Sequence, residues 1–215
     1  MNSGWIRADW PAPAGIIAGT TLRDSEFELP AQPRRINQVH GAGVARWEML
    51  AADDAPPDAD AIVSATPGSL CVVRTADCLP VLLCSNDGGE IAAVHAGWRG
   101  LAAGVIEAAI AALATPPGNL IAWLGPAISQ PAFEVGGEVR DAFLAGSAGA
   151  ADAFEKNARG RWQADLYVLG EQRLQAAGVT AVSGGGLCTH ADAGRFYSYR
   201  RDGSTGRMLS FVYKP

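Results

Sequence analysis

Short apolar runs separated by glycine, proline, asparagine and aspartate dominate the first half of the chain. The runs are rich in valine, isoleucine and threonine, which favour extended structure, and turn residues bound them. This pattern predicts β-strands at residues 15–21, 34–39, 44–47, 61–64, 70–74, 80–84 and 90–94. Two further apolar runs near the C-terminus predict strands at residues 181–183 and 209–213.

Helical patterns follow the strands. Residues 101–114 are alanine-rich and apolar on most sides, which predicts a buried helix that ends before Pro116 and Pro117. Further helices are predicted at residues 137–144 and 164–177. Strands first and helices later predict an α+β fold, with mixed β-sheets and flanking helices in one domain that spans residues 1–215.

A turn sequence, Asn-Asp-Gly-Gly at residues 86–89, joins two of the predicted strands into a hairpin. If the turn is centred in this segment, opposed residues have numbers that sum to about 175. Cys78 then lies opposite Gly97, and His95 lies within two residues of that position. Opposed side chains in an antiparallel pair are about 5 Å apart. The spacing therefore predicts that Cys78 and His95 meet at the open end of the hairpin.

Three interpretations of this pair remain open from the residues alone. Cys78 and His95 could be buried core residues, or they could be a nucleophile and its base, which need only hydrogen-bond contact. They could also be two ligands of a metal such as zinc, which binds thiolate and imidazole and keeps a fourth position open in catalytic sites. His40 would then be the third ligand, because it follows the predicted strand 34–39 and precedes a Gly-x-Gly turn.

The residues after His95 indicate an anion site. Ala96-Gly97-Trp98-Arg99-Gly100 leads into the predicted helix, and helix N-termini with glycine turns and a nearby arginine bind anions. Arg99 is the candidate phosphate ligand. The alternative is that the glycines only shape the turn and Arg99 is solvated. Together with a metal, an anion pocket indicates hydrolysis or phosphorolysis of a small polar substrate.

Composition narrows the protein class. The chain has 215 residues, 48% of them hydrophobic, a formal net charge of −5 and no basic run, which argues against a nucleic-acid binder. Four cysteines are too few for a disulfide scaffold, and Cys71 and Cys84 are expected in the core. With neither a secretory signal nor a membrane-spanning apolar run, we expect a cytoplasmic protein. Residues 50–60 are acidic and predict a surface loop.

Six motifs in a fixed order carry a family resemblance. They are NQVHG (37–41), TADCLPVLL (75–83), AVHAGWRG (93–100), GPAIS (125–129), FEVG (133–136) and FYSYRRDGSTGR (196–207). Together they resemble the YfiH-like family, whose members are variously labelled laccase domain, polyphenol oxidase, purine nucleoside phosphorylase or peptidoglycan editing factor. The resemblance covers the chain from about residue 15 to its C-terminus.

The resemblance implies a fold, a metal and an activity. The fold would be the CNF/YfiH-like cysteine hydrolase fold, and a zinc ion would be held by His40, Cys78 and His95. The substrates would be purine nucleosides and phosphate: phosphorolysis of adenosine, inosine, guanosine and methylthioadenosine, with deamination of adenosine by a zinc-activated water. The oligomeric state stays open.

Other residues receive roles from their positions. Asp77, beside Cys78, could be a general base or could orient a ligand histidine; Arg200 could bind substrate or phosphate; Phe133 could stack on the purine. Each could instead be purely structural. Phe133 stands in Gln130-Pro131-Ala132-Phe133, where family members often carry a cysteine and a tyrosine, so any hydrogen bond from such a hydroxyl is lost here.

The laccase label disagrees with the histidine count. Multicopper oxidases need several copper ions, each bound mostly by histidine, and this chain has three histidines in all. Laccase activity is therefore not expected, and copper is the second choice of metal after zinc. Two alternatives remain: a metal-free Cys–His hydrolase, acting for example on a peptidoglycan precursor, and a non-enzymatic binding module.

Overall fold

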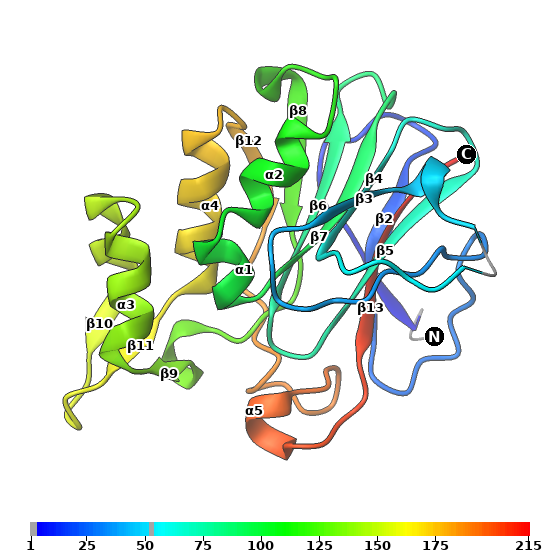
Figure 1. Cartoon of the computed structure of the whole chain (residues 1–215). Coiled ribbons are helices and arrows are strands. Elements are labelled where there is room, and N and C mark those ends of the chain that lie inside the picture. The colour runs from blue at the N-terminus through cyan, green and yellow to red at the C-terminus, as the bar shows by residue number, and fades with distance from the viewer. Residues whose placement is uncertain (1–3, 52–53) are drawn as a thin grey trace.

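Two β-sheets packed face to face form the centre of the protein (Figure 1). The computed structural model describes residues 4–51 and 54–215. The larger sheet is mixed and has the order β12 (Ala181–Gly184), β8 (Leu120–Leu124), β6 (Leu79–Ser85), β7 (Ile91–Ala96), β4 (Ala61–Ser64) and β3 (Val44–Arg46). The second sheet is antiparallel, in the order β1 (Trp5–Arg7), β2 (Ile17–Thr21), β13 (Met208–Lys214) and β5 (Ser69–Thr75).

Helices cover the other face of the larger sheet (Figure 1). They are α1 (Trp98–Ala102), α2 (Val105–Ala111) and α4 (Leu166–Ala176). Leu79, Val81 and Leu83 of β6 belong to the core on the helix side, whereas Leu82 and Cys84 belong to the core between the sheets. Because β6 is buried on both faces, its sequence is a continuous apolar run instead of an alternating one.

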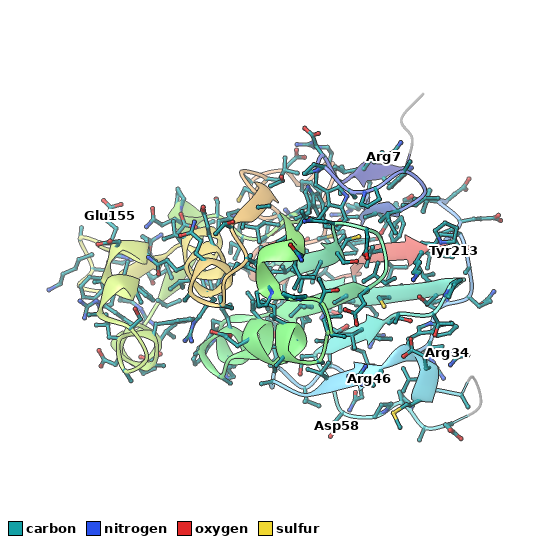
Figure 2. All side chains as sticks on the ribbon, turned by 90° about the horizontal axis from the view of Figure 1, so that it is seen from above. Arg7, Arg34, Arg46, Asp58, Glu155 and Tyr213 are labelled. Carbon is teal, nitrogen blue, oxygen red and sulfur yellow. The ribbon has the colours of Figure 1, made fainter. Side chains whose placement is uncertain are left out.

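A small peripheral layer completes the fold. It contains the antiparallel sheet of β10 (Phe154–Lys156), β11 (Trp162–Ala164) and β9 (Glu134–Val135), together with α3 (Gly137–Leu144). Figure 2 shows Glu155 of β10 and Tyr213 of β13 at opposite ends of the molecule. The short helix α5 (Tyr199–Asp202) lies just before β13, and 3₁₀ turns occupy Trp47–Met49, Pro117–Asn119, Gln130–Ala132 and Ala148–Ala153.

The predicted α+β class is confirmed. The strand at 61–64 and the helix at 137–144 match the observed bounds, and most other predicted strands agree within one or two residues. The strand predicted at 34–39 is wrong: that segment makes only an isolated bridge between Asn37 and Asp58. Strand β8, buried along its whole length, is not among the predicted strands. In the described part of the chain, no helix combines the length and apolarity needed to cross a membrane.

The single helix predicted at 101–114 is also wrong, because Gly104 divides it. Gly104 has φ +89°, a left-handed conformation that ends α1 and begins α2. Its N–H donates to Leu101 O and its carbonyl accepts from the Ala108 N–H. Helical periodicity does not reveal such a break, since glycine is tolerated within a helical pattern.

Substitution Gly104→Ala should therefore destabilise the protein. A Cβ at this position would make only ordinary contacts, at 3.6 Å or more from Glu107, so the cost is the left-handed backbone, about 1–2 kcal/mol. For a chain of this size we expect the melting temperature to fall by roughly 2–8 °C, measured by circular dichroism. The control is Gly118→Ala, whose Cβ would meet nothing within 4 Å. Equal stability of the two variants would contradict the prediction.

Candidate functional site

A cavity of about 700 Å³ opens where the loop at residues 37–41 and the ends of β5, β6 and β7 come together. This volume is in the range that accommodates a small organic ligand. Its lining includes all three members of the predicted metal site, together with Asp77, Phe133 and Arg200. The six motifs of the sequence therefore converge here to a large extent, although they are scattered along the chain.

His40, Cys78 and His95 come together as predicted. Their ligand atoms all lie within 4.8 Å of one another, and they are the one such group among residues 4–51 and 54–215. The two imidazole rings are 4.9 Å apart between centroids and nearly perpendicular, at 74°. Two imidazoles and a thiolate form a donor set suited to zinc or copper. The residues therefore fit a metal ion, and the donor set alone does not identify which one.

The register of the hairpin explains how Cys78 reaches His95. Leu79 pairs with Ala96 and Pro80 with His95, as the spacing predicted. Cys78 thus faces Gly97, where a Cβ atom would lie 2.9 Å from Cys78 Sγ and 3.2 Å from His40 Cδ2. The absence of a side chain at Gly97 leaves room for the sulfur.

His40 comes from a loop and not from the end of a strand. Its φ is +62°, in the left-handed region that few non-glycine residues adopt. The loop is fixed to β5 by Gln38, whose side chain donates to Arg74 O at 2.9 Å and accepts from Arg74 N at 2.8 Å. The side-chain amide of Gln38 thus takes the place of a β-ladder partner.

Asp60 is a site residue that the sequence analysis missed. It was placed at the end of the acidic surface loop 50–60, but its side chain is fully buried. Asp60 Oδ1 lies 2.7 Å from His95 Nδ1 and accepts from the His40 N–H at 2.9 Å. Its position directly before the buried strand β4 is the signal that could have separated it from the loop.

Burial and hydrogen bonding act in opposite directions on the ionisation of the site. Burial disfavours the Cys78 thiolate, but hydrogen bonds from His40 and His95 lower the pKa of the thiol to about 7. Burial likewise disfavours charged His95, but Asp60 and Cys78 raise the pKa of the imidazole to about 9. In the metal-free protein, the Cys78 thiol therefore loses its proton more readily than an ordinary cysteine, and His95 keeps its proton more readily than an ordinary histidine.

Alkylation of metal-free protein should report this thiolate. The thiolate is the nucleophile, so the rate of Cys78 carbamidomethylation by iodoacetamide should rise as the pH increases through about 7. Burial raises the pKa of Cys84 to about 12, so that residue should stay unmodified. Peptide mass spectrometry checks both, and added zinc should protect Cys78. Reaction of Cys78 with a midpoint above pH 8.5 would contradict the prediction.

Asp77 lies in the cavity wall with both oxygens engaged. It is buried, has φ +91°, and accepts hydrogen bonds from Thr189 Oγ1 and the Arg200 N–H, each at 2.6 Å. The sequence analysis considered Asp77 as the residue that orients a ligand histidine, but the hydrogen bond to His95 is made by Asp60 instead. Asp77 is the one acidic side chain in the described lining of the cavity, so the role of general base stays a prediction.

Of the predicted aromatic and cationic site residues, Phe133 and Arg200 line the cavity and Arg99 does not. Phe133 is buried, and Arg200 Cζ lies 5.2 Å from the centroid of its ring. Arg99 is exposed on α1 with Cζ 4.4 Å from the centroid of the Trp98 ring, and it is not among the lining residues. Its role as phosphate ligand stays a prediction.

Two further arginines line the cavity that the sequence analysis did not select. They are Arg74 on β5 and Arg207, which directly precedes β13. Among the described residues, no carboxylate lies within 4 Å of the guanidinium groups of Arg74, Arg200 or Arg207. The chain has a net charge of −5. Three arginines around one cavity, none with a carboxylate as ion-pair partner among the described residues, therefore indicate an anionic ligand.

Comparison with known proteins identifies the family of the chain. A family model described as multi-copper polyphenol oxidoreductase laccase matches residues 12–214. The chain is 46% identical to purine nucleoside phosphorylase PA4543 of Pseudomonas aeruginosa, with 99% of both chains covered. It is 50% identical to purine nucleoside phosphorylase YfiH of Escherichia coli, over 86% of this chain and 75% of that one. The crystal structure of Neisseria meningitidis protein NMB0706 superposes with a TM-score of 0.92 at 41% identity, covering 98% of this chain and 99% of the other.

Proposed function

The chain belongs to the family described as multi-copper polyphenol oxidoreductase laccase, and we propose that it acts as a zinc-dependent purine nucleoside phosphorylase. The proposed substrates are adenosine, inosine, guanosine and methylthioadenosine, with adenosine deamination as a second activity. The observation that carries the proposal is one cavity that combines a His–Cys–His donor set with three arginines that form no ion pair with a described carboxylate. The names of its relatives support the same reaction.

Phosphorolysis requires a site for phosphate beside the ribose. A phosphate oxygen forms a bond to C1′ while the bond from C1′ to the purine nitrogen breaks, and the electron pair leaves with the base. Arg74, Arg200 and Arg207 are the proposed phosphate ligands, because guanidinium groups bind phosphate oxygens through paired, charge-assisted hydrogen bonds. Their location on three different segments would hold the anion in one orientation.

The purine requires an apolar wall, and because it leaves with the electron pair of the broken bond it must take up a proton. Phe133 is the proposed stacking surface, and Tyr199, which is 61% exposed, lies at the rim of the same cavity. Asp77 is the proposed general base: it would accept the proton that the attacking hydrogen phosphate gives up, and the departing purine would take up a proton from solvent. The hydrogen bond that Asp77 accepts from the Arg200 N–H would also hold the phosphate-binding segment against the cavity wall.

The metal is proposed to be zinc, held by His40, Cys78 and His95. When bound, it would supply a Lewis acid at the cavity wall. Zinc is preferred to the copper of the family description because three histidines cannot supply several copper sites.

Product analysis tests the proposal. Zinc-replete protein is incubated with adenosine, with and without phosphate, and the products are separated by chromatography. Adenine and ribose 1-phosphate should form only when phosphate is present, whereas inosine, the product of the proposed deamination, should form in both reactions. Intact adenosine in both reactions, with zinc bound, would overturn the nucleoside proposal.

A metal-free Cys–His hydrolase is the second candidate. The observation that favours it is the Cys78 pKa of about 7, set against burial by hydrogen bonds from His40 and His95, because an activated thiolate is what such hydrolases use. Chelation separates the two. A hydrolase of this kind would keep its activity in the presence of a chelator, whereas the zinc enzyme would lose activity and recover it when zinc is restored.

A further inference from the structure

One buried carboxylate contacts both histidines of the candidate metal centre. Asp60 precedes β4, and its side chain is fully inaccessible to solvent. Oδ1 lies 2.7 Å from His95 Nδ1 and 2.9 Å from the backbone nitrogen of His40. Oδ2 accepts from the N–H groups of Gly41 at 2.7 Å and Val39 at 3.2 Å. Four hydrogen bonds therefore meet on one side chain.

These bonds fix the unusual backbone of His40. Three consecutive N–H groups, from Val39 to Gly41, point at the carboxylate. His40 between them has φ +62°, a conformation that costs a non-glycine residue roughly 1–2 kcal/mol. Hydrogen bonds to a charged acceptor contribute about 1.5–3 kcal/mol each. The hydrogen bonds to the carboxylate therefore contribute enough free energy to offset the strain at His40. They keep its imidazole directed at Cys78.

The same carboxylate fixes the ring of His95. Because Nδ1 is engaged by Asp60, Nε2 is the nitrogen left to face the other two candidate ligands. Carboxylates in this position orient ligand histidines and raise their basicity in other metal proteins. The backbone adds a further link, since the His95 N–H donates to Asp60 O at 2.7 Å.

We propose that Asp60 is a positioning residue that sets the geometry of two metal ligands at once, one through its backbone and one through its ring. The inference rests on the proposed metal site, but not on the proposed reaction. It predicts that loss of the carboxylate weakens metal binding more than loss of a contact to a single ligand would.

Zinc affinity is the direct test. Asp60→Asn keeps the size of the side chain but cannot accept all four bonds. We expect zinc to bind about 10- to 100-fold more weakly, measured by competition with a chromophoric chelator. A double-mutant cycle with His40→Ala tests whether Asp60 acts on His40 as well as on His95. In the His40→Ala background, Asp60→Asn should cost a smaller factor, because its effect on His40 is already gone. Equal factors in both backgrounds would overturn the action through His40.

Glu48→Gln is the matched control. Glu48 Oε1 also accepts several hydrogen bonds, from Ser64 Oγ at 2.5 Å, Ala65 N at 2.9 Å, Thr66 N at 3.2 Å and Thr66 Oγ1 at 3.0 Å. It braces a loop at the end of β4 and is not part of the metal-binding group. Its substitution should lower stability while leaving zinc affinity within about twofold of wild type. An equal loss of affinity in Glu48→Gln and Asp60→Asn would overturn the proposal.

A second pair of variants covers the case in which Asp60→Asn does not fold. Gly41→Pro removes one donor to Asp60, whereas Gly41→Ala keeps the N–H and gives ordinary contacts of 3.6 Å and 3.7 Å. Zinc should bind more weakly to the proline variant, and equal affinities would overturn the proposal. Tight zinc binding by wild-type protein without phosphorolysis would overturn the proposed reaction alone. Absence of zinc binding by wild type would overturn the role assigned to Asp60.

Discussion

Replacement of Cys78 by serine should reduce kcat/KM for adenosine phosphorolysis by more than about 100-fold and should release the metal. Changes beside a metal ligand commonly cost 10- to 100-fold, and loss of a ligand should cost more. A serine hydroxyl stays protonated at neutral pH, whereas hydrogen bonds from His40 and His95 hold the pKa of the Cys78 thiol at about 7 despite burial. Elemental analysis of the purified variant and the phosphorolysis assay measure the two effects.

Cys188→Ser is the control for this substitution. Cys188 is also a free cysteine, but it is outside the metal-binding group of the described residues. This variant should keep its zinc and its activity. A Cys78→Ser protein that still binds zinc tightly and phosphorolyses adenosine would contradict the assignment. If Cys78→Ser is inactive while chelators leave wild-type activity unchanged, Cys78 acts as a nucleophile and the hydrolase takes the place of the zinc enzyme.

The pairing of Cys78 with His95 could be predicted because it depends on local information. Gly88 adopts φ +73° in a tight turn, and its N–H donates to Ser85 O at 2.9 Å. A turn of known position fixes the register of the hairpin, and the register fixes which side chains share a face. Both facts can be read from one short segment, so the predicted and observed pairings agree.

The contact between Asp60 and the two histidines could not be predicted in the same way. It depends on β4 lying beside β7 and on the loop 39–41 folding over the end of β4. Neither arrangement has a sequence signature, because they follow from the strand order of the whole sheet. The composition of residues 50–60 points to a solvated loop, but its last two residues, Ala59 and Asp60, are buried because the buried strand β4 follows them directly.

Arg74 and Arg207, which line the cavity, could not be selected from the sequence for a related reason. Sequence proximity to His95 favours Arg99, but the side chain of Arg99 packs against Trp98. Arg74 and Arg207 are brought together by the pairing of β5 with β13, in which Arg74 faces Leu209. Arg207 is two residues from Leu209, so both arginines belong to the same face of the sheet. This pairing joins segments from the two halves of the chain and leaves no local pattern.

Substitution Arg200→Ala should raise the KM for phosphate and lower kcat/KM for phosphate by about 10- to 100-fold. Hydrogen bonds to a charged group contribute about 1.5–3 kcal/mol, and each 1.4 kcal/mol corresponds to a factor of ten. One guanidinium nitrogen of Arg200 donates to Glu134 O at 3.0 Å, which holds the side chain beside Phe133. The KM for adenosine should change less than threefold, because the role proposed for Arg200 is to bind phosphate and not the nucleoside. Initial rates with each substrate varied in turn separate the two constants.

Arg99→Ala provides the comparison that decides between the two arginines. Because the side chain of Arg99 is exposed, packs against Trp98 and is outside the cavity lining, its loss should leave the KM for phosphate within about twofold of wild type. The opposite pattern, with phosphate affinity lost in Arg99→Ala and kept in Arg200→Ala, would place the phosphate at the start of α1, where the sequence first indicated an anion site. A rise in the KM for adenosine alone in Arg200→Ala would instead assign that arginine to the nucleoside.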